Sequence, residues 1–339
     1  MKYVSLGSSN VKVSEFCLGT MMFGGKTSSE ESIKITRRAL DLGVNFVDAA
    51  DVYTETRCES IVGEALADQT LRDQVVLATK TGMVVGKGPN DHGISRFHYV
   101  RACEASLKRL RTDRIDIYYI HWPDEAMNLD ETLRTLDDLV RQGKILYPAF
   151  SNFPAWLATR SAWICDLQKY APPVCGQYPY SLIERGIEVE ILPMAHALGF
   201  GITTYRPLSI GVLTGKYLDA KPDDSRGQMD ERVEKWNTKY ADGLRKLAAF
   251  AKERNVTAAD IANAWVAAHP VVTSVIVGIS SLAQLESNLK VADFTLTPQE
   301  RETITALFPT EIFEEAGGKV PYWRRTFSIA QPRNNPFTT

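Results

Sequence analysis

Four side chains of different chemistry stand at or just after the ends of apolar segments in the first third of the chain. The segment NFVDAADVY carries Asp48 and, five residues later, Tyr53. The segment LATK ends in Lys80, and IYYIH ends in His121. A carboxylate, a phenol, an ammonium group and an imidazole together suit the reduction of a carbonyl, because the developing alkoxide needs a proton and the carbonyl oxygen needs a donor.

Each of the four groups has its own expected role in such a reaction. Tyr53 would donate the proton, and the ammonium of Lys80 is expected to lower the pKa of the phenol from about 10. Asp48 would hold Lys80 charged and in place, and His121 would orient the carbonyl oxygen. Asp51, in the same stretch as Asp48, is expected to be an ordinary loop residue. Taken singly, each group has a structural explanation, so the prediction depends on their joint occurrence.

One kind of unit would have to position these side chains. A short apolar run followed by an amphipathic helical stretch occurs eight times along the chain. The runs are almost continuously apolar, which is typical of parallel strands covered on both faces. Eight such units in about 250 residues predict an α/β fold of the (β/α)8 TIM barrel type, with a doubly wound open sheet as the alternative. All C-terminal strand ends of a barrel meet at one rim, where barrel enzymes hold their catalytic groups.

Three segments lie outside this repeat. The N-terminal KYVSLGSSNVKVSE predicts an N-terminal β-hairpin that could close the barrel floor. Residues 215–240 predict a long polar insertion after the seventh strand, and residues beyond about 308 predict a C-terminal tail. No stretch has the composition of a linker, so residues 1–339 are expected to form a single domain. Within the repeat, Ser95 is expected to begin a helix and Gly199 to end one.

Composition excludes several classes of function. Lys plus Arg number 39 and Asp plus Glu 41, so the net charge of −2 offers no basic excess for nucleic acid. No signal-like segment and no run of 18 apolar residues occur, so no membrane association is expected. The five cysteines are scattered and lack CxxC spacing, which indicates reduced thiols in a cytoplasmic protein. No metal-ligand spacing and no GxGxxG sequence occur, and the oligomeric state is left open.

The chain also contains, in order, the stretches KVSEFCLGT, VDAADVY, LATK, SLKRLRTDRIDIYYIHWPD, GKILYPAFSNFPAW, QYPYSLIER, GITTYRPLSIGVLTGKY and VIVGISSLAQLESNL. This collinear set resembles the aldo-keto reductase family, in the branch of potassium-channel β subunits and bacterial aldo/keto reductases, over most of the chain. The resemblance implies a (β/α)8 barrel, a nicotinamide cofactor and a catalytic tetrad with Tyr53 as general acid, the other members being Asp48, Lys80 and His121.

The resemblance further implies a cofactor site along the same rim. It matches side chains to the carboxamide, a ring to the nicotinamide, a main-chain path to the pyrophosphate, a basic covering loop and an adenosine-phosphate site before the last helix. In chain order the matched residues are Thr20, Met21, Asp48, Ser151, Asn152, Gln177, Tyr205, Arg206, Pro207, Leu208, Lys216, Arg226, Gly278, Ser280, Gln284 and Asn288.

Three departures from the family pattern concern this cofactor site. Arg206 stands where the family usually has serine, and Ser287 stands where an acid often touches adenine. The region expected to meet a 2′-phosphate carries no basic residue of its own. NADP(H) is favoured because Arg206, Lys216 and Arg226 could supply the charge, and NAD(H) stays possible.

The expected substrate is a small aldehyde or ketone, for example a sugar-type aldehyde. Its pocket, apolar with a few polar groups, would be lined by Phe23, Tyr53, His121 and Trp122. Two other functions stay open. One is a Schiff-base lyase with Lys80 as nucleophile. The other is a non-catalytic, cofactor-binding regulatory subunit, against which the histidine at position 121 argues.

Overall fold

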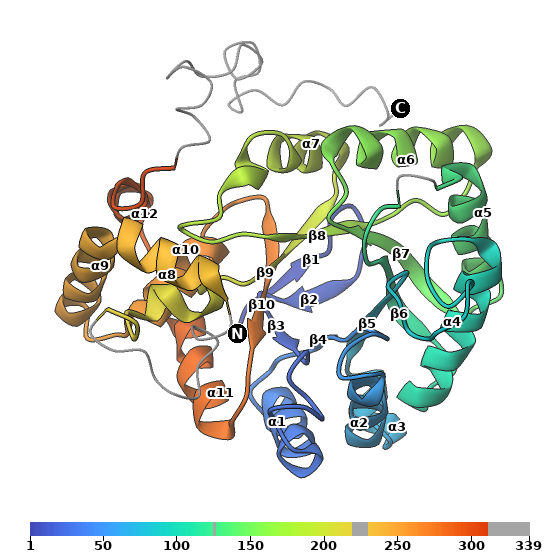
Figure 1. Cartoon of the computed structure of the whole chain (residues 1–339), viewed down its shortest axis with the longest axis horizontal. Coiled ribbons are helices and arrows are strands. Elements are labelled where there is room, and N and C mark those ends of the chain that lie inside the picture. Colours follow the sequence, from blue (N-terminus) through green and yellow to red (C-terminus); the bar gives the residue numbers. More distant parts are fainter. Residues whose placement is uncertain (125–126, 219–229, 311–339) are drawn as a thin grey trace.

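The computed structural model describes residues 1–124, 127–218 and 230–310. Parallel strands close into an eight-stranded barrel (Figure 1), and its last strand pairs with its first, Val275 opposite Phe16 and Gly278 opposite Gly19. This closure confirms the predicted (β/α)8 barrel and excludes the open sheet. The barrel strands are β3 (Phe16–Gly19), β4 (Phe46–Asp48), β5 (Val76–Thr81), β6 (Ile115–Ile120), β7 (Ile145–Ser151), β8 (Cys175–Pro179), β9 (Gly201–Tyr205) and β10 (Val272–Gly278).

Helices surround the barrel as an outer ring (Figure 1), and several begin at a polar cap. Ser95 accepts from the main-chain N–H of His98 at 3.3 Å, as predicted, and Gly199 follows its helix with a φ of +71°. The helices are α1 (Ser29–Asp41), α2 (Arg57–Ala65), α3 (Gln69–Asp73), α4 (Arg96–Leu110), α5 (Leu129–Arg141), α6 (Ala155–Gln168), α7 (Ile191–Leu198), α8 (Glu231–Lys239), α9 (Ala241–Glu253), α10 (Ala258–Ala267), α11 (Leu282–Leu289) and α12 (Pro298–Ala306), with 3-10 turns η1 (Gly186–Glu188), η2 (Ser209–Thr214) and η4 (Lys290–Asp293).

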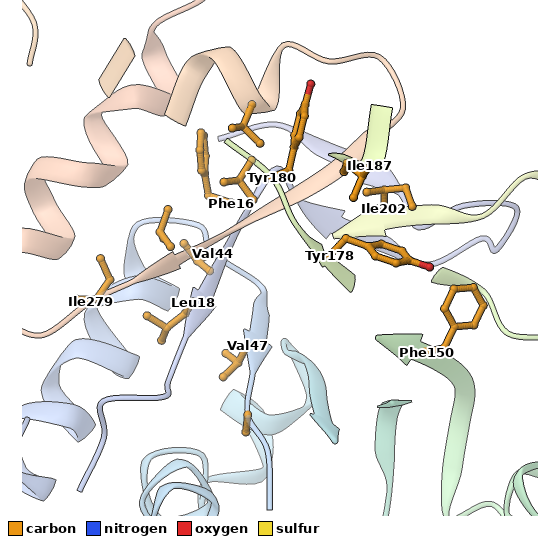
Figure 2. Packing of buried hydrophobic residues seen from close by; sticks show 14 of the residues in the cluster. Phe16, Leu18, Val44, Val47, Phe150, Tyr178, Tyr180, Ile187, Ile202 and Ile279 are labelled. Carbon is orange, nitrogen blue, oxygen red and sulfur yellow. The ribbon is translucent and has the colours of Figure 1, made fainter. Parts of the chain in front are cut away.

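The core has two layers because successive strand residues face opposite sides of the sheet. Phe16 and Leu18 of β3 pack outward against the helices, as Figure 2 shows, while Cys17 between them packs inside the barrel. In β4, Phe46 faces inward and Val47 outward. Both faces of each strand are therefore buried, which explains why the strands appear as continuous apolar runs in the sequence.

The predicted hairpin is present and covers the N-terminal end of the barrel. Strands β1 (Tyr3–Ser5) and β2 (Lys12–Ser14) pair antiparallel, and Leu6 and Val13 are fully buried against the inward-facing cluster. Gly7 has a φ of +58°, and a Cβ there would meet the main-chain nitrogen of Gly201 at 2.4 Å. Only glycine allows this close approach.

Two other predicted features fall partly outside the described residues. The segment 215–240 contains α8, whose Asp230 side chain accepts from the N–H of Arg232, but residues 219–229 lie outside. The tail beyond residue 310 lies outside as well. Within the described part of the chain, no helix combines the length and the apolar character needed to cross a membrane.

Candidate active site

The four residues singled out first come together at the C-terminal ends of three neighbouring strands. Asp48 ends β4, Lys80 lies near the end of β5, His121 directly follows β6, and Tyr53 lies on the loop after β4. Lys80 Nζ donates to Asp48 Oδ2 at 2.7 Å and to the Tyr53 hydroxyl at 3.2 Å. The rings of Tyr53 and His121 meet edge to face, with centroids 5.9 Å apart. The barrel register therefore brings together four residues that are spread over 74 positions of the sequence, from Asp48 to His121.

The ammonium of Lys80 is fully buried and has three acceptors. Besides Asp48 and Tyr53, it donates to the carbonyl oxygen of Ala49 at 2.7 Å. Burial by itself would lower the pKa of Lys80, but the carboxylate of Asp48 and the phenol of Tyr53 outweigh it and raise the pKa above its usual value. Lys80 is therefore a charged group, held in place by Asp48, Ala49 and Tyr53.

Tyr53 differs from the expectation that Lys80 would leave its pKa below the ordinary value. Burial raises the pKa of Tyr53 to about 12, and the ammonium of Lys80 only partly offsets this. The cost of placing a phenolate in a weakly solvated site exceeds the attraction to the neighbouring cation, which is already paired with Asp48. Tyr53 consequently keeps its proton at neutral pH, as a proton donor must.

His121 is buried and neutral. Burial, followed by the nearby charge of Lys80, lowers the pKa of His121 to about 3. Its Nδ1 atom is buried and has no hydrogen-bond partner among the described residues. A neutral imidazole carries one N–H, so His121 can donate to a carbonyl oxygen without adding a charge to the site.

Asp48 connects the cluster to the opposite wall of the barrel. Its Oδ1 atom accepts from Gln177 Nε2 at 2.9 Å, while Oδ2 accepts from Lys80. Gln177 lies on β8, four strands from β4 in either direction around the closed order. The hydrogen bond therefore spans the barrel mouth, and both carboxylate oxygens have defined partners.

Asn152 is the centre of a second network, beside His121. It adopts a φ of +61° directly after β7. Its Nδ2 donates to the carbonyl oxygen of His121 at 3.1 Å and to Ser151 Oγ at 2.9 Å, and its Oδ1 accepts from the Tyr205 hydroxyl at 2.8 Å. The aromatic ring of Tyr205 is thereby fixed relative to the loop that carries His121.

Arg206 has a neighbour that sequence reasoning missed. It has a φ of +58°, its guanidinium lies 5.0 Å from the centroid of the Tyr205 ring, and Nη2 lies 3.2 Å from Glu184 Oε1. Within the described residues, the buried atoms Arg206 Nε and Glu184 Oε2 have no hydrogen-bond partner. Burial raises the pKa of Glu184, although Arg206 and Arg232 oppose this. Glu184 follows β8, and its signal in the sequence was only its place after a strand.

The residues matched to the adenosine-phosphate site lie at the end of β10 and on α11. Gly278 is exposed with open space around it, and Asn288 is buried. Ser280 donates through N and Oγ to Gln284 Oε1, at 2.8 and 2.9 Å. Glu31 of α1 accepts from the N–H of Leu282 at 3.0 Å, so one donor of this helix start already has a carboxylate partner.

The residues of the nicotinamide and pyrophosphate parts fit a dinucleotide in several respects. The unpartnered Arg206 Nε suits a phosphate oxygen, and the open backbone at Gly278 permits close approach of a second one. Pro207, directly after Arg206, is buried and Leu208 is half-buried. Lys216 is exposed, with its ammonium 5.0 Å from the Tyr217 ring centroid. Arg226 lies outside the described residues.

At the first strand, the matched residues differ in accessibility. Thr20 is buried and its hydroxyl donates to the carbonyl oxygen of Asp48 at 2.8 Å, whereas Met21 is 46% exposed. Phe23, expected to line the substrate pocket, is fully buried in the outer core. A side chain with no exposed surface cannot contact a substrate in this conformation, and its loop folds Phe23 inward. Trp122, 51% exposed, is accessible to solvent, and its place in a substrate pocket stays a prediction.

Asp51 is not the ordinary loop residue that the sequence suggested. It is buried, one carboxylate oxygen accepts from Thr81 Oγ1 at 2.5 Å, and the other has no partner among the described residues. Burial raises the pKa of Asp51 to about 7. The described residues contain no group of His, Cys, Asp and Glu side chains arranged to hold a metal ion.

Comparison with known proteins gives a consistent assignment. The model of the aldo/keto reductase family matches residues 15–308. The "Uncharacterized oxidoreductase YrpG" of Bacillus subtilis is 35% identical over 330 residues, which cover 95% of this chain and 98% of the relative. A "Probable voltage-gated potassium channel subunit beta" of Arabidopsis thaliana is 37% identical over 308 residues, 88% and 94% of the two chains. A putative subunit of the same name from Schizosaccharomyces pombe is 32% identical over 310 residues, 87% and 89% of the two chains.

These relatives confirm the branch that the sequence stretches predicted, and the closed barrel agrees with them. The chain therefore belongs to the aldo/keto reductase family, whose members are oxidoreductases that use nicotinamide cofactors.

Proposed function

We propose that this protein reduces a small aldehyde or ketone, of the sugar type among others, to an alcohol with NADP(H), and that Tyr53 is the general acid. The observation that carries the proposal is the contact of the Tyr53 hydroxyl with the buried, charged Lys80, 3.2 Å away, beside a neutral His121. A phenol that keeps its proton next to a fixed cation can deliver that proton to an alkoxide, and the cation stabilises the phenolate that remains.

The remaining side chains prepare this transfer. Asp48 fixes Lys80 by a 2.7 Å contact, so the ammonium need not reorganise when the phenolate forms. His121 donates its N–H to the carbonyl oxygen and leaves the charge of the site unchanged. Trp122, exposed beside His121, supplies apolar surface to the pocket.

The nicotinamide cofactor, when bound, supplies the hydride. Gln177, Ser151 and Asn152 are the proposed carboxamide ligands, and Tyr205 the ring that stacks on the nicotinamide. Two of these would have to exchange a present hydrogen bond, because Gln177 donates to Asp48 and Asn152 to His121 and Ser151. Thr20 and Met21 contribute first-strand contacts in this proposal.

The preference for NADP(H) over NAD(H) is proposed from the basic groups. Among the described residues, the buried Nε–H of Arg206 has no partner, and Lys216 is exposed. In this proposal Lys216 and Arg226, the latter outside the described residues, add cationic charge. Pro207 and Leu208 would lie along the pyrophosphate, and Gly278, Ser280, Gln284 and Asn288 would meet the adenosine phosphate. We propose a cytoplasmic location, since all five cysteines are free and buried, and a small-molecule partner instead of nucleic acid or membrane.

The decisive assay follows NADPH absorbance with a panel of small aldehydes, ketones and sugar aldehydes. Tyr53→Phe is expected to lower kcat by roughly 10²- to 10⁴-fold, the usual contribution of a positioned proton donor. Its affinity for NADPH, measured by quenching of protein fluorescence, should change little. Rates near those of the unmodified protein in Tyr53→Phe would refute the role given to this phenol.

A regulatory subunit is the second candidate, favoured by the names of the channel-subunit relatives. It predicts tight NADPH binding with negligible turnover for every carbonyl in the panel. A Schiff-base lyase has less support. Burial favours a neutral Lys80, but Asp48 and Tyr53 dominate and raise its pKa, so the neutral nucleophile is scarce. A borohydride-trapped adduct on Lys80 would reverse that ranking.

A further inference from the structure

Helix α6 exposes two tryptophans and a leucine on the outside of the barrel. Trp156 is 63% exposed, Trp163 55% and Leu167 59%. Figure 1 shows α6 in the outer ring of helices. Tryptophan is rarely left so accessible, and contiguous apolar patches of this kind mark interaction surfaces.

The exposed residues form one stripe, opposite the side by which α6 packs on the barrel. At about 100° per residue, positions 156, 160, 163 and 167 fall within an arc of about 60°. The buried positions of the helix lie on the far side of that arc: Leu157, Ala158, Ser161 and Cys165. The helix thus carries apolar side chains on two opposite faces, and packing within the described part of the chain buries only one of these faces.

The stripe has the spacing of a helix-pairing seam. Its positions are separated by four, three and four residues, which is the a/d pattern of packed helices. This spacing is also symmetric about its midpoint, between residues 161 and 162. An identical antiparallel helix would therefore place Trp156 opposite Leu167 of its copy and Arg160 opposite Trp163 of its copy.

Arg160 makes the stripe electrostatically self-complementary. It is exposed and forms no ion pair with any described residue. A guanidinium above an indole face is a favourable pair, and the two-fold arrangement creates it twice. The two exposed indoles and the leucine offer roughly 400 Å² of apolar surface per copy. Doubled, this is about half of a standard interface, with Arg160 and Thr159 adding area beside it.

We propose that α6 is a homodimer interface, in which the stripe Trp156, Arg160, Trp163 and Leu167 pairs antiparallel with the same stripe of a second copy. The two-fold axis passes midway between Arg160 and Trp163. The interface is closed and isologous, so the assembly stops at two copies. This inference is independent of the proposed function.

The test is sedimentation velocity of the full-length protein across concentrations from about 1 to about 200 µM, the range of a modest interface. The unmodified protein should dimerise within it. Trp163→Lys removes the ring and faces Arg160 of the copy with a like charge, so the dissociation constant should rise roughly 100-fold or more. Trp163→Glu also removes the ring but faces the same Arg160 with an opposite charge, so its rise should stay within roughly tenfold at low salt.

The matched control is Phe97→Lys on α4. Phe97 is 60% exposed, and the guanidinium of Arg101 lies 5.1 Å from its ring centroid. This control should dimerise like the unmodified protein. Circular dichroism verifies that each variant is folded.

Three outcomes would overturn the proposal. One is an unmodified protein that stays monomeric at every concentration. Failure of acrylamide to quench Trp163 in such a monomer would indicate that residues 311–339, and not a second copy, cover the stripe. Another is a dimer that Trp163→Lys leaves intact. The third is an equal rise of the dissociation constant in Trp163→Lys and Trp163→Glu, which would refute the antiparallel register that places Arg160 opposite Trp163.

Discussion

Tyr53 and His121 have pKa values shifted in opposite directions by the same cause. Burial penalises the charged form of each, so the phenol keeps its proton and the imidazole stays uncharged. Lys80, which is fully buried, keeps its charge because Asp48 and Tyr53 contact its ammonium. One site therefore holds a fixed cation beside two neutral donors, which is the protonation pattern that carbonyl reduction requires.

These directions predict the pH dependence of catalysis. Since the pKa of His121 is about 3 and that of Tyr53 about 12, neither group of the free protein changes its charge near neutrality. With a neutral aldehyde, kcat/KM should be flat from about pH 5 to about pH 9, and should fall above that only as Tyr53 begins to lose its proton. Initial rates of NADPH oxidation measure this. A step near pH 7 would contradict it, unless Asp51→Asn abolishes the step and so assigns it to Asp51.

Asp51 predicts a pH-dependent stability. Its pKa of about 7 in the folded state exceeds the unfolded value of about 3.9, so the folded state holds the extra proton between these values. Its contribution to the free energy of unfolding is therefore present at low pH and is lost as pH rises through 7. As pH rises from about 5 to about 8, the free energy of unfolding of Asp51→Asn should increase by about 3 kcal/mol relative to that of the unmodified protein. Urea unfolding measures this difference. A constant difference between the two proteins would contradict the buried-carboxylate assignment.

Residue identity and strand position sufficed to predict which of the four reactive side chains meet, because parallel strand ends share one rim. They failed for Phe23, Asp51 and Glu184, since the burial of a loop side chain depends on contacts with distant segments. The hydroxyl of Thr54 accounts for part of the Phe23 loop by donating to its carbonyl oxygen at 2.7 Å. Such contacts have no local signal. The net direction of the Tyr53 pKa shift could not be predicted either, because burial, which raises this pKa, outweighs Lys80, which lowers it.

At the scale of secondary structure, the hairpin β1–β2 is held by a main-chain approach that allows no side chain. Gly7→Ala should lower the free energy of unfolding by about 1–2 kcal/mol because of the left-handed backbone, and by about 1–3 kcal/mol more because of the clash with Gly201. Gly143→Ala is the matched control, since Gly143 has a φ of +72° and no atom within 4 Å of its added Cβ. Chemical denaturation compares the two. Equal destabilisation of Gly7→Ala and Gly143→Ala would show that the hairpin accommodates the added Cβ without a loss of stability.

The elements themselves were predictable and their closure was not. Each strand has its own apolar run, and most helices have an amphipathic face or a cap, so the repeat of eight units is a local signal. The pairing of β10 with β3 joins residues at opposite ends of the described chain, such as Val275 and Phe16, and only the assembled barrel fixes it. The family resemblance supplied what local patterns lacked.

In the whole molecule, the two ends of the barrel have different tasks. The hairpin buries Leu6 and Val13 at the N-terminal end, while the four proposed catalytic groups gather at the C-terminal rim. This separation would allow the rim loops to vary without disturbing the hairpin that covers the other end. The proposed interface on α6 would add an assembly without altering either end.

The hydrogen bond from Gln177 to Asp48 joins strands on opposite sides of the barrel. A fluctuation that separates neighbouring strands on one side of the barrel would also strain this hydrogen bond and, through Asp48, displace Lys80. In the absence of cofactor, opening of the barrel is therefore expected to disturb the position of Lys80 as well.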